Sequence, residues 1–423
     1  MLSTLRNAWK VPELRKRFLW TIFLVAIFRI GIHIPVPGID TSALSTLTES
    51  GGLLSFYNLI SGGAFTKASI LALSVSPYIN ASIIMQLLTI AIPSLEQLSK
   101  EGEEGRKKIQ SITRYVSIGI ACVLALGVYS TIANLGATSG VGTLEKIVII
   151  FSLVVGSTFC MWLGDQITQK GFGNGVSILI FVNIVSQIPS TVNSVYTLKT
   201  AGEISIIEIL LFLVGVIALL AVTIFFSLAE RRVPIQYAGK AVGSKVMKGQ
   251  STHIPLSIIG SAVIAIIFAM SVMMFPTTIA AFFPSKGWAS WITSSKYSIF
   301  NTGTWMYPVC YAVLTVFFTW FYTQITFKPD EMAENLHKSA GFVPGIRPGE
   351  ATEKYFEKLL TKVSIIGGLF AAFLAVTPIL VGKYISGVQF GGTSLLILIG
   401  VALDFSRQLD SQLVMRHYDG FLK

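Results

Sequence analysis

The chain has 423 residues, of which 52% are hydrophobic and 13% are charged, and its mean hydropathy is +0.70. Charged residues make up about a quarter of a soluble protein, and disordered chains are far less apolar, so the composition excludes both classes. Lys and Arg outnumber Asp and Glu by 32 to 21, and membrane proteins carry such an excess in cytosolic loops. We therefore expect an integral membrane protein without direct DNA binding.

Ten apolar stretches approach the length of roughly 20 residues that a membrane-spanning helix needs. The first, 18–34, contains one charged residue, Arg29, near its end, where a long side chain can reach the lipid headgroups. The other nine contain no charged residue, and they predict an all-α membrane protein with ten spans. They are 68–95, 115–144, 147–164, 171–198, 209–229, 254–285, 297–327, 363–382 and 384–403.

The basic residues predict the orientation of these spans. With the N-terminus in the cytosol, 25 Lys and Arg residues fall in cytosolic loops and six in outer loops, as the positive-inside rule requires. Both termini are then cytosolic. Two cytosolic connections, about 230–253 and 328–362, are longer than a helix link needs. They are either solvated loops or, in our preferred interpretation, a docking surface for RNA or an acidic protein face.

A short apolar segment, 53–61, lies between the first two spans with a glycine pair on each side. At 1.5 Å per residue it reaches roughly 14 Å, about half of a hydrocarbon core. Two interpretations stay open: an amphipathic helix on the outer surface, or a re-entrant helix enclosed by protein. The next span begins with Pro77, Asn80 and several hydroxyls, which suit a surface that faces protein rather than lipid.

The spans contain almost no ionisable residue near their centres. Ion-coupled transporters commonly place carboxylates or histidines there, so a secondary transporter for a small solute is the weaker alternative. If the protein moves a substrate, the energy must come from a partner or the membrane potential. The charged residues in or beside the spans lie toward their ends: Arg29, Asp165, Glu208, Glu230 and Asp404.

Histidines and cysteines predict neither a metal site nor a disulfide framework. The four histidines form no HExxH motif, and Cys122, Cys160 and Cys310 form no CxxC pair. A membrane-embedded hydrolase is therefore disfavoured. The glycine-rich stretch 171–175 lies between two spans with no strand before it, so we interpret it as a turn rather than a nucleotide-binding loop. We expect no cofactor, no metal and no enzymatic activity.

Eight motifs, in order along nearly the whole chain, resemble the bacterial SecY family of protein-translocation channels. They are 35–40 (PVPGID), 61–64 (SGGA), 77–88 (PYINASIIMQLL), 100–108 (KEGEEGRKK), 173–177 (GNGVS), 250–256 (QSTHIPL), 342–349 (FVPGIRPG) and 391–397 (GGTSLLI). The resemblance implies a channel that passes unfolded secretory polypeptides across the bacterial plasma membrane and releases apolar segments sideways into lipid.

The implied fold is two inverted five-helix halves, 1–200 and 201–423, around an hourglass pore. Ten spans divide into five and five, which is compatible with inverted repeats, although no repeat is visible in the residues. A plug helix over about 53–66 would close the outer side, which favours the re-entrant interpretation. The matching plug residues are Leu53, Leu54, Phe56, Tyr57, Asn58, Leu59 and Ile60.

The resemblance also assigns a pore ring of aliphatic side chains, which cannot replace the hydration shell of an ion. Ala265 stands where some relatives carry proline, so both Ile264 and Ile267 stay candidates for the inward residue of the seventh span. The ring residues are Val75, Ile79, Ile180, Ile184, Ile267 and Ile397. A lateral gate between the second and third spans and the seventh and eighth would include Ser82, Gln86 and Phe275.

The partners that the resemblance implies are SecE, SecG, the SecA motor, the ribosome, secretory preproteins and membrane lipid. The long cytosolic loops would hold the docking residues for SecA and the ribosome, because basic side chains bind phosphate and carboxylate groups. These residues are Arg231, Arg232, Lys240, Lys248, Arg347 and Lys354.

Overall fold

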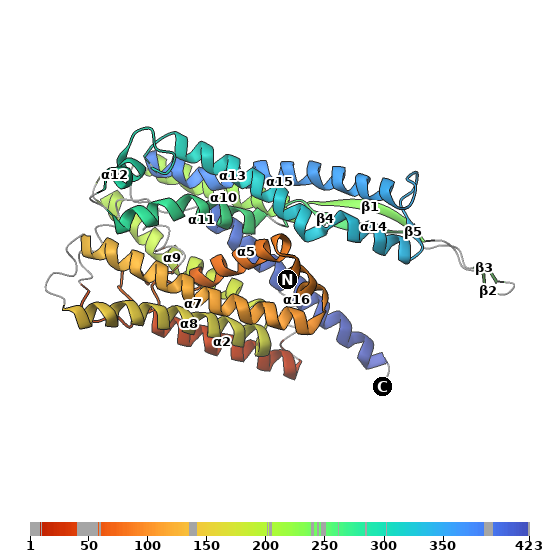
Figure 1. The fold of residues 1–423 in the computed structure, drawn as a ribbon, viewed down its shortest axis with the longest axis horizontal. Helices are drawn as coiled ribbons and strands as arrows, with labels where there is room; N and C mark the ends of the chain where they lie inside the picture. Colours follow the sequence, from red (N-terminus) through yellow and green to blue (C-terminus); the bar gives the residue numbers. More distant parts are fainter. Residues whose placement is uncertain are drawn as a thin grey trace.

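The structure is a computed structural model, and over the residues it describes the protein is mainly helical, with long helices running side by side (Figure 1). The described residues are 9, 11–39, 58, 61–134, 142–200, 202, 205–237, 241–242, 245–246, 251–260, 262–283, 286–301, 303–384 and 392–421.

The first part of the chain forms six of these helices. Helices α2, α7 and α8 lie together on one side of the molecule (Figure 1). The break between α5 and α6 turns the chain by 101°; Ile92 is extended there because the next residue is Pro93, which disfavours helical backbone before it. The helices are α2 (Pro12–Gly31), α5 (Ser76–Ala91), α6 (Pro93–Lys100), α7 (Glu103–Asn134), α8 (Thr143–Lys170) and α9 (Gly175–Thr200).

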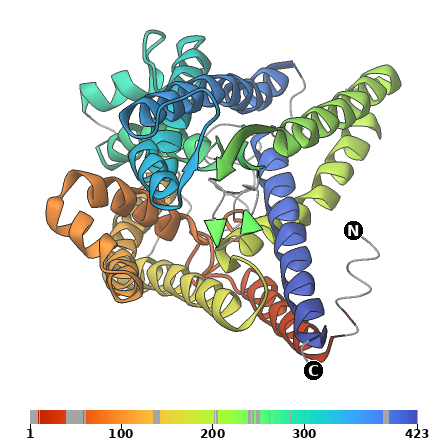
Figure 2. The ribbon, with the colours of Figure 1, turned by 90° about the vertical axis from the view of Figure 1, so that its right-hand side faces the viewer.

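The second part of the chain forms seven helices. Helices α13 and α15 pack extensively against each other on the opposite side from α7 and α8, and α16 lies beside α2 in the end-on view (Figure 2). They are α10 (Ile206–Leu228), α11 (Ala262–Phe282), α12 (Gly287–Ser294), α13 (Met306–Phe327), α14 (Pro329–Lys338), α15 (Glu350–Tyr384) and α16 (Gly392–Phe421).

The two long loops predicted at 230–253 and 328–362 contain regular structure. Strand β1 (Glu230–Tyr237) pairs antiparallel with β4 (Ser251–Ser257), and β5 (Gly341–Phe342) adds to the other edge of β1. The short strands β2 (Ala241–Val242) and β3 (Lys245–Val246) pair with each other further along the hairpin. The hairpin projects from one end of the helical body (Figure 1).

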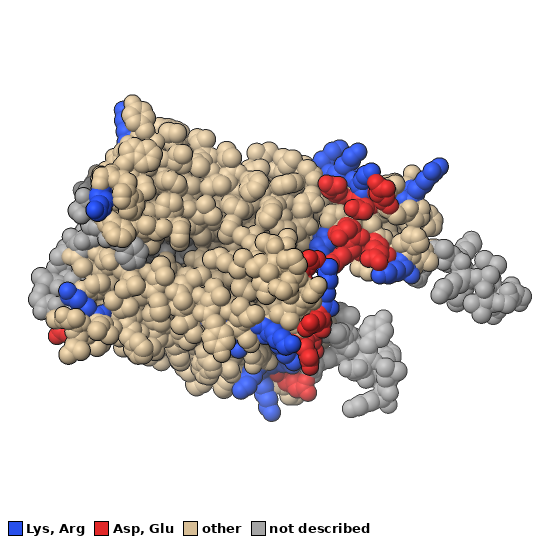
Figure 3. All heavy atoms as spheres, in the orientation of Figure 1, with Lys and Arg blue, Asp and Glu red and all other residues tan. Residues whose placement is uncertain are grey.

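A wide band without charged side chains separates the two ends of the molecule on the face shown in Figure 3. Seven described helices are long and apolar enough to cross a membrane, and the bent pair α5–α6 is an eighth candidate. Helices α2 and α16 overlap the predicted spans 18–34 and 384–403 but also carry charged residues. The protein is thus a helical, multi-span membrane protein, and the count of ten spans stays a prediction.

Three predicted spans have wrong boundaries. The second begins at Ser76 rather than at 68, because residues 61–75 form turns in which Ala68 and Ser74 have positive φ. The stretch 254–257 is strand β4 and not helix. Helix α13 begins at Met306 rather than at 297, because side chains before it bond to local backbone, as in the bond from Thr304 Oγ1 to the Ser298 carbonyl.

Candidate functional site

The six residues predicted to form a pore ring lie in one hydrophobic cluster. Val75, Ile180, Ile184 and Ile397 are buried in this cluster, and Ile79 and Ile267 are partly buried against it. These residues come from the segment before α5 and from α5, α9, α11 and α16. Because Val75 directly precedes α5, four separate parts of the chain converge on one aliphatic contact.

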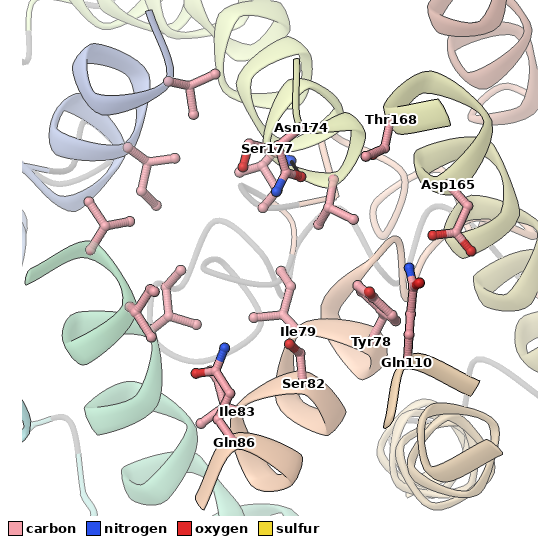
Figure 4. Close-up of a pocket in the computed structure, with 17 residues that line it drawn as sticks. Tyr78, Ile79, Ser82, Ile83, Gln86, Gln110, Asp165, Thr168, Asn174 and Ser177 are labelled. Atoms are coloured by element: carbon pink, nitrogen blue, oxygen red, sulfur yellow. Dashed lines mark hydrogen bonds between the residues drawn. The ribbon is translucent and has the colours of Figure 1, made fainter. Parts of the chain in front are cut away.

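A cavity of about 360 Å³ borders this aliphatic cluster (Figure 4). Four of the six predicted ring residues line it: Ile79, Ile180, Ile267 and Ile397. Ile264 lines the cavity as well, but it is 38% exposed and lies outside the cluster, whereas Ile267 packs against it. Both candidates from the seventh predicted span therefore face the cavity.

The cavity has polar residues along its α5, α7, α8 and α9 sides. The α11 and α16 sides are aliphatic and include Val263, Ile267, Ile397 and Val401. A space with one polar and one apolar side can hold a segment that carries both kinds of side chain. The polar lining residues are Tyr78, Ser82, Gln86, Gln110, Asp165, Thr168, Asn174 and Ser177.

Among the residues that the structure describes, Asp165 is the one charged residue that lines this cavity. Its carboxylate oxygen lies 2.7 Å from Arg114 Nη2, so an ion pair joins α8 to α7, and the Asp165 side chain is only 14% exposed. The glycine-rich turn 171–175, predicted as a turn, connects α8 to α9 beside this pair. The pair fixes the polar side of the cavity.

Helices α5 and α11 meet over a short stretch. There the Ser271 hydroxyl of α11 lies 2.8 Å from Asn80 Oδ1 of α5 and 2.9 Å from the carbonyl of Ile267. Because a hydroxyl has one proton, it donates to one of these acceptors at a time. The sequence indicated that Asn80 faces protein, but Ser271 was missed, since its partner depends on how α11 is rotated.

Two of the three predicted gate residues lie beside this seam. Ser82 and Gln86 line the cavity from α5. Phe275 lies one turn beyond Ser271 on α11 and is 64% exposed, so it faces outward and is not among the lining residues. The structure therefore places Ser82 and Gln86 at the cavity and leaves Phe275 on the outer surface.

Of the predicted plug residues, only Asn58 belongs to the part of the chain that the structure describes; Leu53, Leu54, Phe56, Tyr57, Leu59 and Ile60 lie outside it. The Asn58 side chain accepts hydrogen bonds from the backbone N–H and the hydroxyl of Thr66, at 3.2 and 3.0 Å. The backbone carbonyl of Asn58 accepts a hydrogen bond from the Gly63 N–H at 2.9 Å. Asn58 is therefore tied to the turns that precede α5.

The predicted docking residues differ in their ion pairs. Arg231, Arg232 and Arg347 are exposed and form no ion pair with any other described residue. Lys354 is exposed too, but its ammonium lies 2.6 Å from a Glu350 carboxylate oxygen. The three arginines therefore keep their charge available for a partner, whereas that of Lys354 is partly compensated.

Lys240 and Lys248 lie outside the residues whose placement the structure describes. The base of the hairpin is held by an ion pair from Arg407 of α16 to Glu230 of β1, at 3.3 Å. The arginines Arg231 and Arg232 follow Glu230 directly, so this contact sets where they stand relative to the helices.

Comparisons with known proteins agree with this architecture. The SecY family profile matches residues 69–406. The chain is 40% identical over 420 residues to the protein translocase subunit SecY of Rickettsia typhi, with 97% of this chain and 96% of the relative covered. It is also 40% identical to the subunit of Escherichia coli strain K12, over 97% of this chain and 94% of that one.

The chain belongs to the SecY family. Membership confirms the resemblance seen in the eight motifs, and with it the function: this SecY family member is the protein-conducting channel subunit of a translocase. It is a transporter and not an enzyme, as the sequence predicted.

Solved structures share the fold. One described as the structure of a protein conducting channel aligns with a TM-score of 0.66 at 18% identity, covering 97% of both chains. Sec61 in the canine ribosome-channel complex from the endoplasmic reticulum aligns with a TM-score of 0.62, also at 18% identity and 97% coverage of both chains. At these identities the likeness concerns the fold, and the SecY channel fold is the architecture found here.

Proposed function

We propose that the aliphatic cluster around Ile79 and Ile397 is the closed constriction of the channel. The observation that carries this proposal is the convergence of six aliphatic side chains, from four separate parts of the chain, beside a partly polar cavity. Aliphatic carbons offer no ligand that could replace the hydration shell of an ion. The same side chains can move apart around a polypeptide, since no strong bond joins them.

The seam between α5 and α11 is our candidate for the lateral gate. The two helices meet over a short stretch and share the contact between Asn80 and Ser271 at 2.8 Å. Separating them would open the cavity toward lipid. An apolar segment would then gain roughly 0.3 to 0.6 kcal/mol per Leu, Ile, Val or Phe by entering the bilayer, whereas a polar segment would stay in the channel.

The exposed arginines of the hairpin and of the 342–349 turn are our candidates for docking the SecA motor or the ribosome. The guanidinium group can form two parallel hydrogen bonds with a phosphate or a carboxylate. In this assignment the hairpin end faces the cytosol, as do both termini, and the host membrane is the bacterial plasma membrane. SecE and SecG would complete the channel, and unfolded preproteins would be the substrate.

The constriction is tested with polar substitutions at its centre. Ile397→Asn and Ile267→Asn should raise ion leak through proteoliposomes that contain the protein, and should let preproteins with defective signal sequences pass, because an amide attracts water into the contact. Ile397→Leu, which keeps the aliphatic character, and Ile279→Asn, at a position of α11 that is 36% exposed, are matched controls. Equal leak and equal signal stringency in all four variants would contradict the assignment.

A further inference from the structure

A polar face runs along the middle of α9. Asn183, Ser186 and Gln187 stand three and four residues apart, so they lie on one side of the helix. Asn183 has no exposed surface, and Ser186 and Gln187 are half-buried. A polar face at membrane depth must contact protein or a hydrated space, and the partners here are the turns at 61–75, Asn58 and α2.

Asn183 contacts both ends of the turns that precede α5. Its Nδ2 donates to Ser74 Oγ at 3.3 Å. At the other end Gly62 lies so close that a Cβ on it would stand 2.5 Å from Asn183 Oδ1 and 2.9 Å from Cγ. Gly62 also has a φ of +67°, a conformation that favours glycine. The turns are therefore built around the amide group of Asn183.

Gln187 makes the second contact, one helical turn further along α9. Its Nε2 donates to the carbonyl of Asn58 at 3.3 Å, and a Cβ on Gly63 would lie 3.2 Å from the same Nε2. Asn58 in turn accepts the two bonds from Thr66. Gln187 thus holds the residue that organises the start of these turns.

Ser186 fixes the direction of this polar face. Its hydroxyl accepts a bond from Arg29 Nη1 of α2 at 2.9 Å and donates to the carbonyl of Asn183 at 2.7 Å. The rotation of α9 is therefore set by α2, independently of the turns. The contact between Arg29 and Ser186 thus presents Asn183 and Gln187 toward the turns without using either side-chain amide.

The two amides lie next to the aliphatic cluster. Ile180 and Ile184 of the cluster are on the same helix, within one turn of Asn183, and Val75 of the cluster follows Ser74 directly. The amides lie beyond Ile180 toward the Thr200 end of α9, whereas Asn174, which lines the cavity, lies at its other end. Each of the two side-chain amides donates a hydrogen bond of 3.3 Å, slightly longer than the usual range of about 2.7–3.2 Å, so water or a passing backbone can replace it readily.

We infer that Asn183 and Gln187 are positioning residues that clamp Asn58 and the turns at 61–75 against α9 in the closed channel. The inference rests on the proposed constriction and adds a way to regulate its opening. The turns can leave the aliphatic cluster only when the hydrogen bonds of both side-chain amides break. Once freed, the two amides face the passage and can bond to water or to the backbone of the moving polypeptide.

The clamp is tested by the accessibility of Ala64, which has no exposed surface and belongs to the aliphatic cluster. Ala64→Cys is introduced into a background in which the three native cysteines are alanine, and the protein in lipid nanodiscs is labelled with a charged maleimide. Adding Asn183→Leu and Gln187→Leu should raise the labelling rate at least about five-fold. Asn193→Leu, at an exposed position of the same helix, should leave it unchanged.

Gly62→Ala gives a second test that leaves both amides in place. Its Cβ would displace Asn183, so it should raise the labelling of Cys at position 64 as well. Gly202→Ala is the matched control, because Gly202 also has a positive φ of +77° but no atom within 4 Å of an added Cβ. Where Asn183→Leu prevents membrane insertion, Gln187→Leu and Gly62→Ala still decide the question.

Labelling that stays at the parent rate in Gln187→Leu and Gly62→Ala overturns the clamp. The readout needs no transport, so it separates the clamp from the proposed function. Raised labelling together with unchanged ion leak would support the clamp and count against the sealing role of the cluster beside it.

Discussion

Asn80 and Ser271 illustrate how few polar atoms join the two sides of the proposed gate. Their contact at 2.8 Å connects α5 to α11, and both side chains are part-buried. An unpaired buried polar group costs about 1 to 3 kcal/mol, so the contact favours the closed arrangement more than its own modest net energy suggests.

Ser271→Ala should therefore shift the gate toward its open arrangement by about 1 kcal/mol, or roughly five-fold, because the Asn80 amide loses its partner while the helices stay together. The measurement is the export rate of a preprotein with a weakened signal sequence, which should rise. Ser290→Ala in α12, whose hydroxyl bonds only within its own helix, should have no effect. An unchanged export rate in Ser271→Ala would remove this contact from the gate.

The ion pair between Arg114 and Asp165 is a second contact between two residues whose loss should measurably lower the free energy of unfolding. Arg114→Ala leaves the Asp165 carboxylate, which is 14% exposed, without its partner. Removing one member of a buried pair destabilises a protein more than removing both, so we expect a loss of about 1 to 2 kcal/mol, discounted for the partial exposure of Arg114.

Thermal unfolding in detergent measures this loss. The double substitution Arg114→Ala with Asp165→Asn should recover much of the stability, as a double-mutant cycle reveals. Lys354→Ala removes a fully exposed pair with Glu350 and should change the unfolding temperature little. If Arg114→Ala is as stable as Lys354→Ala, the pair is not what holds the polar side of the cavity.

At the scale of elements, the β1–β4 hairpin turns an apparently irregular loop into a rigid projection. Val233 and Ile235 are buried and alternate with exposed residues along β1, and they pack with Phe356 and Leu360 of α15. Arg231 and Arg232 are therefore displayed on a strand that is anchored to the helical body.

Charge reversal at the three exposed docking arginines, Arg231, Arg232 and Arg347, should weaken export without affecting membrane insertion of the protein. Arg347→Glu, and Arg231→Glu with Arg232→Glu, should lower SecA-driven export in proteoliposomes several-fold, since a repulsive charge replaces a free guanidinium. Lys354→Glu should have a smaller effect because its charge is already compensated by Glu350. Export at the parent rate in the Arg347 variant would exclude that residue from the docking surface.

The sequence predicts features that depend on neighbouring residues better than features that depend on contacts between distant parts of the chain. Apolar length located the long helices, and the motifs brought Val75, Ile180 and Ile397 into one predicted site, because both signals are local in the chain. The turns at 61–75 were missed, since Ala68 and Ser74 have positive φ in segments held by tertiary contacts: Ala68 packs in a cluster with α7 and α8, and Ser74 bonds to Asn183 of α9. The β1–β4 pairing was also missed, because β1 contains Pro234 and β4 contains Pro255, and proline within a run argues against a strand.

For the whole molecule, the helices of the first and of the second part of the chain form two groups. They meet at the aliphatic cluster, where α11 contacts α5 and α7, and at an aromatic contact at the hairpin end. There Phe18 of α2 and Phe405 of α16 both pack against Phe172, with ring centroids 5.1 and 4.8 Å from it. The aliphatic cluster contains no hydrogen bond between its side chains, whereas the aromatic rings are closely packed. The two groups of helices can therefore separate more easily at the aliphatic cluster than at the aromatic contact.

Helix α10 is the least buried of the candidate membrane spans in the described part of the chain. Only 6% of its apolar window is buried by the protein, although Phe226 stacks on Phe370 of α15 at 4.1 Å. Its 23 residues reach about 35 Å, slightly more than a hydrocarbon core of about 30 Å. Its tilt must therefore adapt to bilayer thickness, and through the stacked rings a thinner or thicker membrane acts directly on the helices of the second group.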